Sequence, residues 1–217
     1  MIGMWATVAG AAVVTLSVTR GPLRRLHAEG RRKALHIGLG LLGAGFVWLF
    51  THPLPVVLVG GTFTLLMLTL RTRRGRRLLP RTGRRLRHAL GGHGRNAGSY
   101  GDACFAAGIT LAFVVSYLGG HHPMTHLAAV LTLTFADPAA TALGRRVRSP
   151  RLASGKSLVG SLTFTLIAAC VLVGLETPPL VALPIALAAS AAECLCPKGT
   201  DNLGVPLTVA VLHAFTY

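Results

Sequence analysis

The sequence predicts an all-helical integral membrane protein, a bundle of about eight transmembrane helices formed by a single domain over residues 1–217. Two observations carry this prediction. Apolar residues make up 52% of the chain and charged residues only 13%, whereas a soluble protein of 217 residues needs more charge to cover its surface. In addition, all 22 basic residues lie between alternate apolar stretches.

Eight apolar stretches can be followed along the chain, at 2–19, 34–50, 54–70, 103–118, 126–143, 158–175, 180–195 and 203–217. Most have 15 to 18 residues, slightly fewer than the ~20 that a perpendicular helix needs to cross a bilayer, and the last is the weakest of the set. The first is not expected to be a cleaved signal, because its positive charges follow the apolar run instead of preceding it.

Small residues and prolines mark particular stretches. An Ala-rich run occupies 186–192, and the second stretch contains four glycines at 38, 40, 43 and 45. Small residues let membrane helices approach closely, so packing accounts for them. Pro138 and Pro184 are expected to interrupt the fifth and seventh helices.

The basic residues alternate strictly between loops. Residues 20–33 carry six, 71–102 carry ten arginines, 144–157 carry five and 196–202 carry one, while the other loops and both termini carry none. The positive-inside rule then places these four loops in the cytoplasm of a bacterial-type inner membrane and both termini outside. The arginine run at 71–95 is expected to set topology and face anionic lipid. It is not expected to bind nucleic acid, because no aromatic residues interleave with it.

Histidines and cysteines add little chemistry to this pattern. The motif HHPMTH at 121–126 has no acidic partners, so we interpret it as an interfacial loop. The four cysteines form no readable disulfide framework, and Cys-Leu-Cys at 194–196 is a weak metal signal.

Asp137 is the most informative of the six acidic residues. It lies inside an apolar stretch, seven residues before Gly144, which is about 10 Å below the cytoplasmic loop. A carboxylate at this depth is costly unless it is paired, protonated, metal-bound or open to a water-filled cavity. We therefore predict a functional site, and the alternative is a buried Asp–Arg pair that fixes helix packing.

Other charged residues are expected at the same cytoplasmic mouth. They are Lys33, His36, Asp102, Lys156, Glu193 and Asp201. Several carboxylates beside cations are typical of a divalent metal that carries a polyphosphate.

The letters GKS at 155–157 raise the question of a P-loop. That motif needs a glycine where this chain has Pro150, and it needs a preceding strand, so the P-loop interpretation fails. Ser157 can instead cap the sixth helix, whose first amides would be unpaired and could bind phosphate with Lys156. Gly155 and Gly160 would allow close backbone approach. The alternative is a capped helix start beside a snorkelling lysine.

Five segments together share a pattern with one known family. They are RRKALH at 31–36, GSYGD at 98–102, DPAATALG at 137–144, GKSLVGS at 155–161 and ECLCPKGTDNLGVP at 193–206. In this order they resemble motifs of the CTP-dependent lipid kinases, which include dolichol (polyprenol) kinase, phytol and farnesol kinases and the yeast-type diacylglycerol kinase. Two positions depart from the family pattern: Val159 stands where many members have Glu, and Arg148 where many have a second Gly.

The resemblance implies transfer of the γ-phosphate of CTP to a membrane lipid alcohol, either an isoprenoid alcohol or a diacylglycerol. It implies Mg²⁺ held on the CTP phosphates by Asp137, with Glu193 or Asp201 in place of the missing glutamate. Either Asp102 or His36 would accept the proton of the alcohol. The implied nucleotide-binding residues are Arg32, Lys33, Ala140, Gly144, Gly155, Lys156, Ser157, Gly160 and Asn202.

Two other functions stay open at this point. A cytidylyltransferase would use the same nucleotide and metal but attack the α-phosphate, releasing pyrophosphate. A transporter of an anionic solute would use Asp137 as a midway site, although no clear inverted repeat supports it. The expected partners are CTP, a lipid alcohol and membrane lipids. The sequence does not indicate an oligomeric state.

Overall fold

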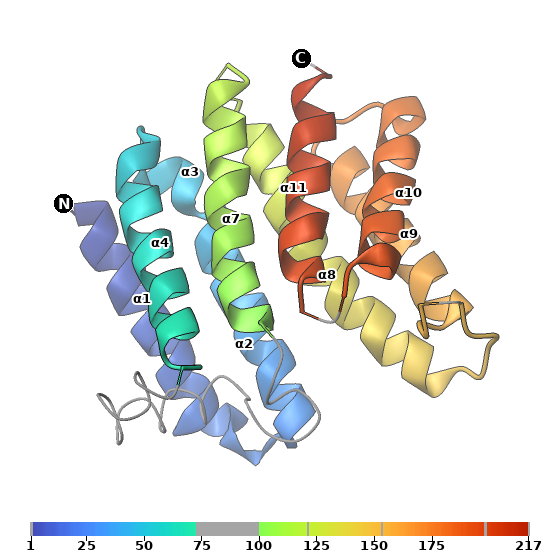
Figure 1. Ribbon diagram of the computed structural model, residues 1–217, viewed down its shortest axis with the longest axis horizontal. Coiled ribbons are helices and arrows are strands. Elements are labelled where there is room, and N and C mark those ends of the chain that lie inside the picture. Colours follow the sequence, from blue (N-terminus) through green and yellow to red (C-terminus); the bar gives the residue numbers. More distant parts are fainter. Residues whose placement is uncertain (1, 73–99, 121, 153, 198, 217) are drawn as a thin grey trace.

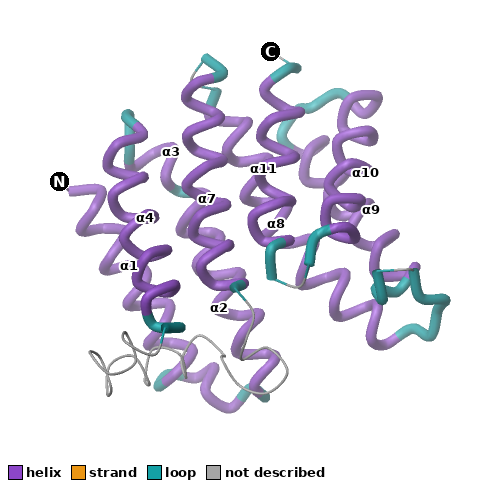
Figure 2. The backbone as a smooth tube through the Cα atoms, viewed as in Figure 1, coloured by secondary structure: helices purple, strands orange, loops and turns teal. Residues whose placement is uncertain are grey.

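The protein folds as a bundle of helices (Figures 1 and 2). The computed structural model describes residues 2–72, 100–120, 122–152, 154–197 and 199–216. Within these residues the elements are α1 (Ile2–Thr19), the 3-10 helix η1 (Pro22–Arg25), α2 (Ala28–Ala44), α3 (Phe46–Leu49), α4 (Pro53–Thr69), α7 (Gly101–Leu118), α8 (Pro123–Arg146), α9 (Leu158–Gly174), α10 (Pro179–Leu195) and α11 (Asp201–Ala214).

The described residues confirm the all-helical fold class. Each of the eight apolar stretches forms a helix, and the second divides at Gly45 into α2 and the short α3. The described part contains no strand, only an isolated antiparallel bridge between Arg151 and Ser157. Most of the arginine run (73–99), Lys198 and the start of the GSYGD and HHPMTH motifs lie outside the described residues.

Three helices in the described part, α1, α7 and α8, are long and apolar enough to cross a membrane. Three more, α4, α9 and α10, are apolar but shorter. Large apolar side chains cover the outside of the bundle, among them Leu58, Leu65, Leu162, Leu166 and Leu180. An apolar exterior of this extent suits a lipid environment better than water.

Helix α8 is the centre of the packing. It contacts α2, α7, α9 and α11 (Figure 1), and Ala128, Ala129 and Val130 on it are fully buried. Small residues bring the neighbours close: a Cβ added at Gly40 of α2 would lie 2.2 Å from Oγ1 of Thr134. The glycines of α2 therefore serve helix packing, as the sequence indicated.

Two expectations from the sequence are wrong. Pro138 and Pro184 do not interrupt their helices, because α8 runs unbroken from Pro123 to Arg146 and α10 from Pro179 to Leu195. The HHPMTH motif is not simply an interfacial loop. Helix α8 begins at Pro123, and His126 is fully buried with its Nε2 2.9 Å from the carbonyl oxygen of Gly43.

The described loops fall at two ends of the bundle (Figure 2). One end, the basic end, holds the segments 20–27, 70–72, 147–157 and 196–200, and the opposite end holds the turns at 51–52, 119–122 and 175–178. The chain enters α1 and leaves α11 toward the opposite end (Figure 1). This arrangement brings motifs that are distant in the sequence to the basic end.

Candidate active site

A cavity of about 960 Å³ opens at the basic end of the bundle. It lies among α2, α4, α7 and α8, the loop 147–157, the start of α9 and the α10–α11 junction. Every site residue expected from the sequence lines it except Lys33, whose side chain binds a lining residue instead. Segments from five motifs, separated by up to about 170 residues in the chain, therefore share one space.

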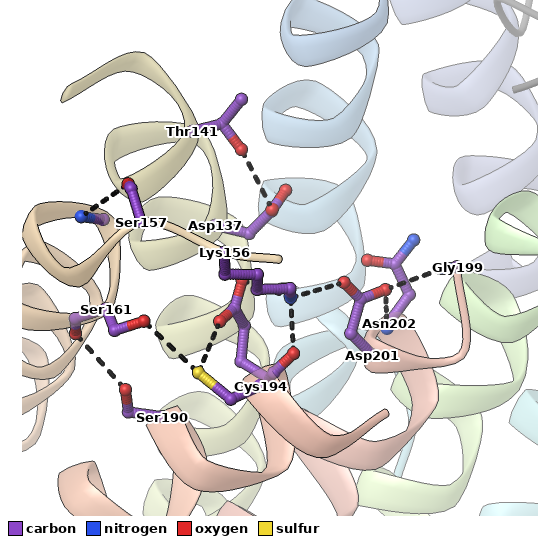
Figure 3. A network of polar contacts seen from close by, with 12 residues as sticks. Asp137, Thr141, Lys156, Ser157, Ser161, Ser190, Cys194, Gly199, Asp201 and Asn202 are labelled. Atoms are coloured by element: carbon purple, nitrogen blue, oxygen red, sulfur yellow. Dashed lines mark hydrogen bonds and ion pairs between the residues drawn. The ribbon is translucent and has the colours of Figure 1, made fainter. Parts of the chain in front are cut away.

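Asp137 of α8 is paired with Lys33 of α2. The Lys33 ammonium donates to Oδ2 of Asp137 at 2.6 Å and to Oγ1 of Thr141 at 3.1 Å. The Thr141 hydroxyl donates in turn to Oδ1 of Asp137 at 3.4 Å (Figure 3). The side chains are only 18% and 13% exposed for Asp137 and Lys33. The deep carboxylate is thus neutralised, by a lysine and not by the arginine of the alternative we considered.

His36 lies beside this pair but is engaged elsewhere. Its Nε2 is 3.2 Å from the carbonyl oxygen of Leu133 and 3.9 Å from Oδ2 of Asp137, and its ring packs on Phe105 with centroids 4.5 Å apart. A carbonyl oxygen can only accept, so Nε2 carries the hydrogen. His36 therefore links α2 to α8 through Leu133, and its Nε2 cannot accept a proton.

Lys156 binds two carboxylates on the α10–α11 side of the cavity. Its ammonium binds both the carboxylate and the backbone oxygen of Glu193, and it reaches Oδ2 of Asp201 at 3.2 Å (Figure 3). Asp201 is fixed by the amides of Gly199 and Asn202 at 3.2 and 3.1 Å. Burial lowers the pKa of Lys156, but the two carboxylates raise it by more, so the pKa lies above its ordinary value and the lysine stays charged.

The loop before α9 is a small hairpin. The Leu152 amide donates to the Lys156 carbonyl at 2.8 Å, and Gly155 takes a positive φ of 80° that favours glycine. Ser157 caps α9 as expected, since its Oγ accepts from the Gly160 amide at 3.1 Å. The absence of a strand from this described loop agrees with our rejection of a P-loop.

The expectation of free amides at the start of α9 is wrong. The Leu158 amide donates to the Pro150 carbonyl at 2.9 Å and the Val159 amide lies 3.3 Å from the Ser149 hydroxyl, while Ser157 takes the third. The hairpin folds back over the helix start and supplies these acceptors. The first amides of α9 are therefore not available to an anion in the cavity.

Ala140 and Gly144 have a structural role in the described contacts. They lie on one face of α8, where a Cβ at Gly144 would approach Oγ of Ser157 to 2.4 Å and Cα of Gly160 to 3.2 Å. The same face carries Asp137 one to two turns earlier. The pattern Asp-x-x-Ala-x-x-x-Gly thus fixes α9 against α8 and directs the carboxylate into the cavity.

Several lining residues were not identified from the sequence as site residues. They are Glu29, Thr141, Arg145, Arg148 and Arg151. Glu29 binds Arg32 at 2.8 Å and Arg145 at 3.6 Å, so these charges form a network at the mouth. The arginines were interpreted as topology signals alone. Their spacing of three residues along 145–151 was the available sign that they face one side.

The cavity lining balances five acidic with five basic side chains. The acids are Glu29, Asp102, Asp137, Glu193 and Asp201, and the basic residues are Arg32, Arg145, Arg148, Arg151 and Lys156. Among the described lining residues, Nε of Arg32 is buried without a hydrogen-bond partner. A polyanion that enters with its counter-ion can pair with such a lining without leaving net charge buried.

The predicted magnesium ligands, Asp137 with Glu193 or Asp201, all line the cavity, and each is bound to a lysine. Among the described residues no group of three His, Cys, Asp or Glu side chains could hold a metal ion, because Asp137 is held by Lys33 and the other two share Lys156. The donors are nevertheless hard oxygen atoms, which suit Mg²⁺. The residues fit a Mg²⁺ that arrives on phosphate groups and needs one or two carboxylates, and they do not fit an ion held by protein alone.

No family model, curated protein or solved structure matches the chain. The cavity itself combines fixed cations, recessed carboxylates and a partly apolar wall.

Proposed function

We propose that the protein is a membrane-embedded kinase that transfers the γ-phosphate of CTP to a lipid alcohol. One observation carries this proposal. A single cavity of about 960 Å³ combines the recessed Asp137 and five cationic side chains with a partly apolar wall inside a helical bundle. Pockets for single small ligands range up to about 1,000 Å³, so this one has room for a nucleotide and the head of a lipid.

The proposed roles follow from position. Lys156 and the arginines at 145, 148 and 151 bind the triphosphate, because they are the lining cations on the side of α8 and the loop 147–157. Asp137 would hold Mg²⁺ on the phosphates, and that ion would neutralise charge on the phosphoryl group during transfer. Phosphoryl transfer depends on positioning and charge neutralisation more than on covalent chemistry by the protein, so few further groups are needed. The identity of the donor as CTP rests on the motif resemblance.

The proposed topology has eight membrane crossings with the cavity on the cytoplasmic side of a bacterial-type inner membrane. It is supported by the basic segments at one end of the bundle and by Trp5, Trp48 and Phe215, which are exposed toward the other end. Aromatic residues at the interface and basic residues on the cytoplasmic side are typical of inner-membrane proteins. CTP is cytoplasmic, so this orientation gives the nucleotide access.

The transporter alternative has less support. A transport path would continue from the cavity to the opposite end of the bundle. On that route Ala128, Ala129 and Val130 of α8 are fully buried by packing. A second pocket, near Phe113 and Tyr117, is only about 10 Å³, or room for about one water molecule.

Purified protein incubated with Mg²⁺, labelled CTP and a panel of lipid alcohols tests the proposal. We expect release of CDP with formation of a lipid monophosphate. Release of pyrophosphate with a CDP-lipid would instead identify a cytidylyltransferase. The variant Asp137→Asn in the same detergent serves as the control for contaminating activity.

A further inference from the structure

The cavity has two unlike walls. The wall formed by α8, the loop 147–157 and the α10–α11 junction is mainly polar; it carries Asp137, Thr141, Arg148, Lys156 and Asp201, with Ala140 and Val147 between them. The facing wall, formed by α2, α4 and α7, is polar at the mouth and apolar further in. This difference separates the cavity into a region for a polyanion and a region for an amphiphile.

Spacing along two helices produces the change in polarity. On α2, Arg32, His36 and Leu39 share the face that lines the cavity, and Leu39 is about 10 Å deeper than Arg32. On α7, Asp102 at the mouth is followed one turn deeper by Phe105. Phe63 of α4 completes the deep region, two turns from the basic end of its helix. Phe63 and Leu39 are half-buried and so remain accessible from the cavity.

The charges of this wall are already paired with one another. Arg32 binds Glu29 at 2.8 Å, and Arg71 lies 3.9 Å from the carboxylate of Asp102 and 4.9 Å above the ring of Tyr100. A lipid phosphate or carboxylate at this wall would lie near Glu29 and Asp102, whose partner arginines are already engaged. An uncharged hydroxyl, which can donate to the Asp102 carboxylate and accept from the partly exposed guanidinium of Arg32, fits this mouth better.

We infer that the α2–α4–α7 wall is the acceptor subsite and that it takes an uncharged long-chain alcohol, with its hydroxyl between Arg32 and Asp102 and its hydrocarbon chain on Leu39, Phe63 and Phe105. This inference rests on the proposed function and deepens it. It selects a neutral alcohol over a lipid phosphate as the acceptor, and it separates the lipid from the nucleotide wall.

The geometry also distinguishes between the two candidate bases. Asp102 is 37% exposed at the side chain and faces the subsite, whereas Nε2 of His36 donates to Leu133. The alcohol oxygen forms a bond to the γ-phosphorus while the bond from that phosphorus to the β–γ bridging oxygen breaks. The bridging electron pair leaves on CDP, and the hydroxyl proton passes to Asp102. The products are a lipid monophosphate, CDP and the released proton.

Photolabelling of the wild-type protein tests the placement of the chain directly. The probe is a long-chain alcohol with a terminal diazirine, irradiated with the detergent-purified protein and mapped by peptide mass spectrometry. We expect label in α2, α4 and α7 at or near Leu39, Phe63 and Phe105. An unlabelled alcohol of equal length should compete at least about tenfold better than the matching carboxylic acid. Label confined to α9 and α10, or equal competition by the acid, would overturn the inference.

Matched variants of α4 provide the second test. Phe63→Ala removes an aromatic ring from the subsite, whereas Leu65→Ala changes a lipid-facing residue that does not line the cavity. We expect Phe63→Ala to lower kcat/KM for long-chain relative to short-chain alcohols by about tenfold, since loss of such a contact removes of the order of 1.5 kcal/mol. Leu65→Ala should leave this ratio unchanged. Equal ratios in the two variants would contradict the subsite.

The two proposals fail in different ways. If the wild type forms no CDP with any alcohol but the probe still labels α2, α4 and α7, the kinase proposal is wrong and the lipid subsite stands. If CDP forms but the label and the Phe63→Ala ratio show no preference for this wall, the kinase proposal stands and the subsite is wrong. Asp102→Asn should lower kcat about 100-fold with little change in the KM for CTP.

Discussion

Asp137 and Lys33 depend on each other at the scale of single residues. Each is the close partner of the other, at 2.6 Å, and both are largely buried. The variant Asp137→Asn leaves Lys33 charged without that partner. Because removing one member of a buried pair is costly and this pair keeps some solvent contact, we expect a loss of about 2 kcal/mol in the free energy of unfolding, together with loss of CTP turnover. Thermal unfolding and turnover on one preparation measure both.

A double variant separates stability from catalysis. Lys33→Met combined with Asp137→Asn removes both charges, so we expect most of the lost stability to return while turnover stays absent. Wild-type stability in Asp137→Asn would show that the pair contributes nothing to the fold. Recovery of turnover in the double variant would show that Asp137 serves packing alone.

Lys156 gives a prediction about pH. Burial lowers its pKa, but the hydrogen bonds and charges of Glu193 and Asp201 raise it by more, above its ordinary value of 10.5. A raised folded-state pKa means that the stabilisation is complete below the unfolded-state pKa and is lost only as the pH rises through the folded-state value. Lys156→Met should therefore lower the melting temperature by the same amount at about pH 6 and about pH 9. A difference that shrinks toward the higher pH would contradict the pairing.

At the scale of elements, the crossing of α8 and α9 depends on two glycines. A Cβ at Gly144 would lie 2.4 Å from Oγ of Ser157 and 3.2 Å from Cα of Gly160, so Gly144→Ala must separate the helices or displace the α9 cap. We expect a loss of about 1–3 kcal/mol in stability. Gly61→Ala of α4 is the matched control, because its Cβ meets nothing within 4 Å, and it should be neutral or stabilising. Equal thermal unfolding of the two variants would show that the helices are not in close contact.

The same elements show what the sequence could and could not predict. Helix positions and the Ser157 cap followed from local signals, namely apolar runs and a serine before one of them. The acceptors of the first α9 amides, Ser149 and Pro150, could not be predicted because they depend on the register of a hairpin. Pro138 does not break α8, since tertiary packing on four sides holds that helix together.

The ion-pair partner of a given charged residue also could not be predicted from the sequence. Asp137 was identified from its depth in an apolar stretch, but Lys33 lies 104 residues away in the chain and its distance from Asp137 is set by the packing of α2 on α8. The arginines at 145, 148 and 151 were explained fully by topology, so nothing required a second role for them. The sequence pattern of these arginines indicated their role in topology, but it did not indicate that they line a cavity.

At the scale of the whole molecule, the two ends of the bundle differ in charge. Basic segments, the cavity mouth and the paired lysines lie at one end of the bundle, and the exposed tryptophans lie toward the other. The central helix α8 connects the two ends, since it is mostly buried over residues 125–136 and ends at the mouth with Arg145 and Arg146. Basic residues of the proposed cytoplasmic loops, among them Arg145, Arg148, Arg151 and Lys156, therefore also line the cavity.

Cysteine labelling in intact cells tests this division. In a background without native cysteines, a cysteine at Thr51 or within 120–122 should react with an impermeant maleimide from outside, because these turns lie at the end without basic residues. A cysteine at the exposed Ser154, or within 82–84 of the arginine run, should react only after permeabilisation. Labelling of Ser154→Cys from outside would put the cavity mouth on the side without CTP. The kinase proposal could not survive that result, whereas the helical fold and the contacts within the cavity would be unaffected.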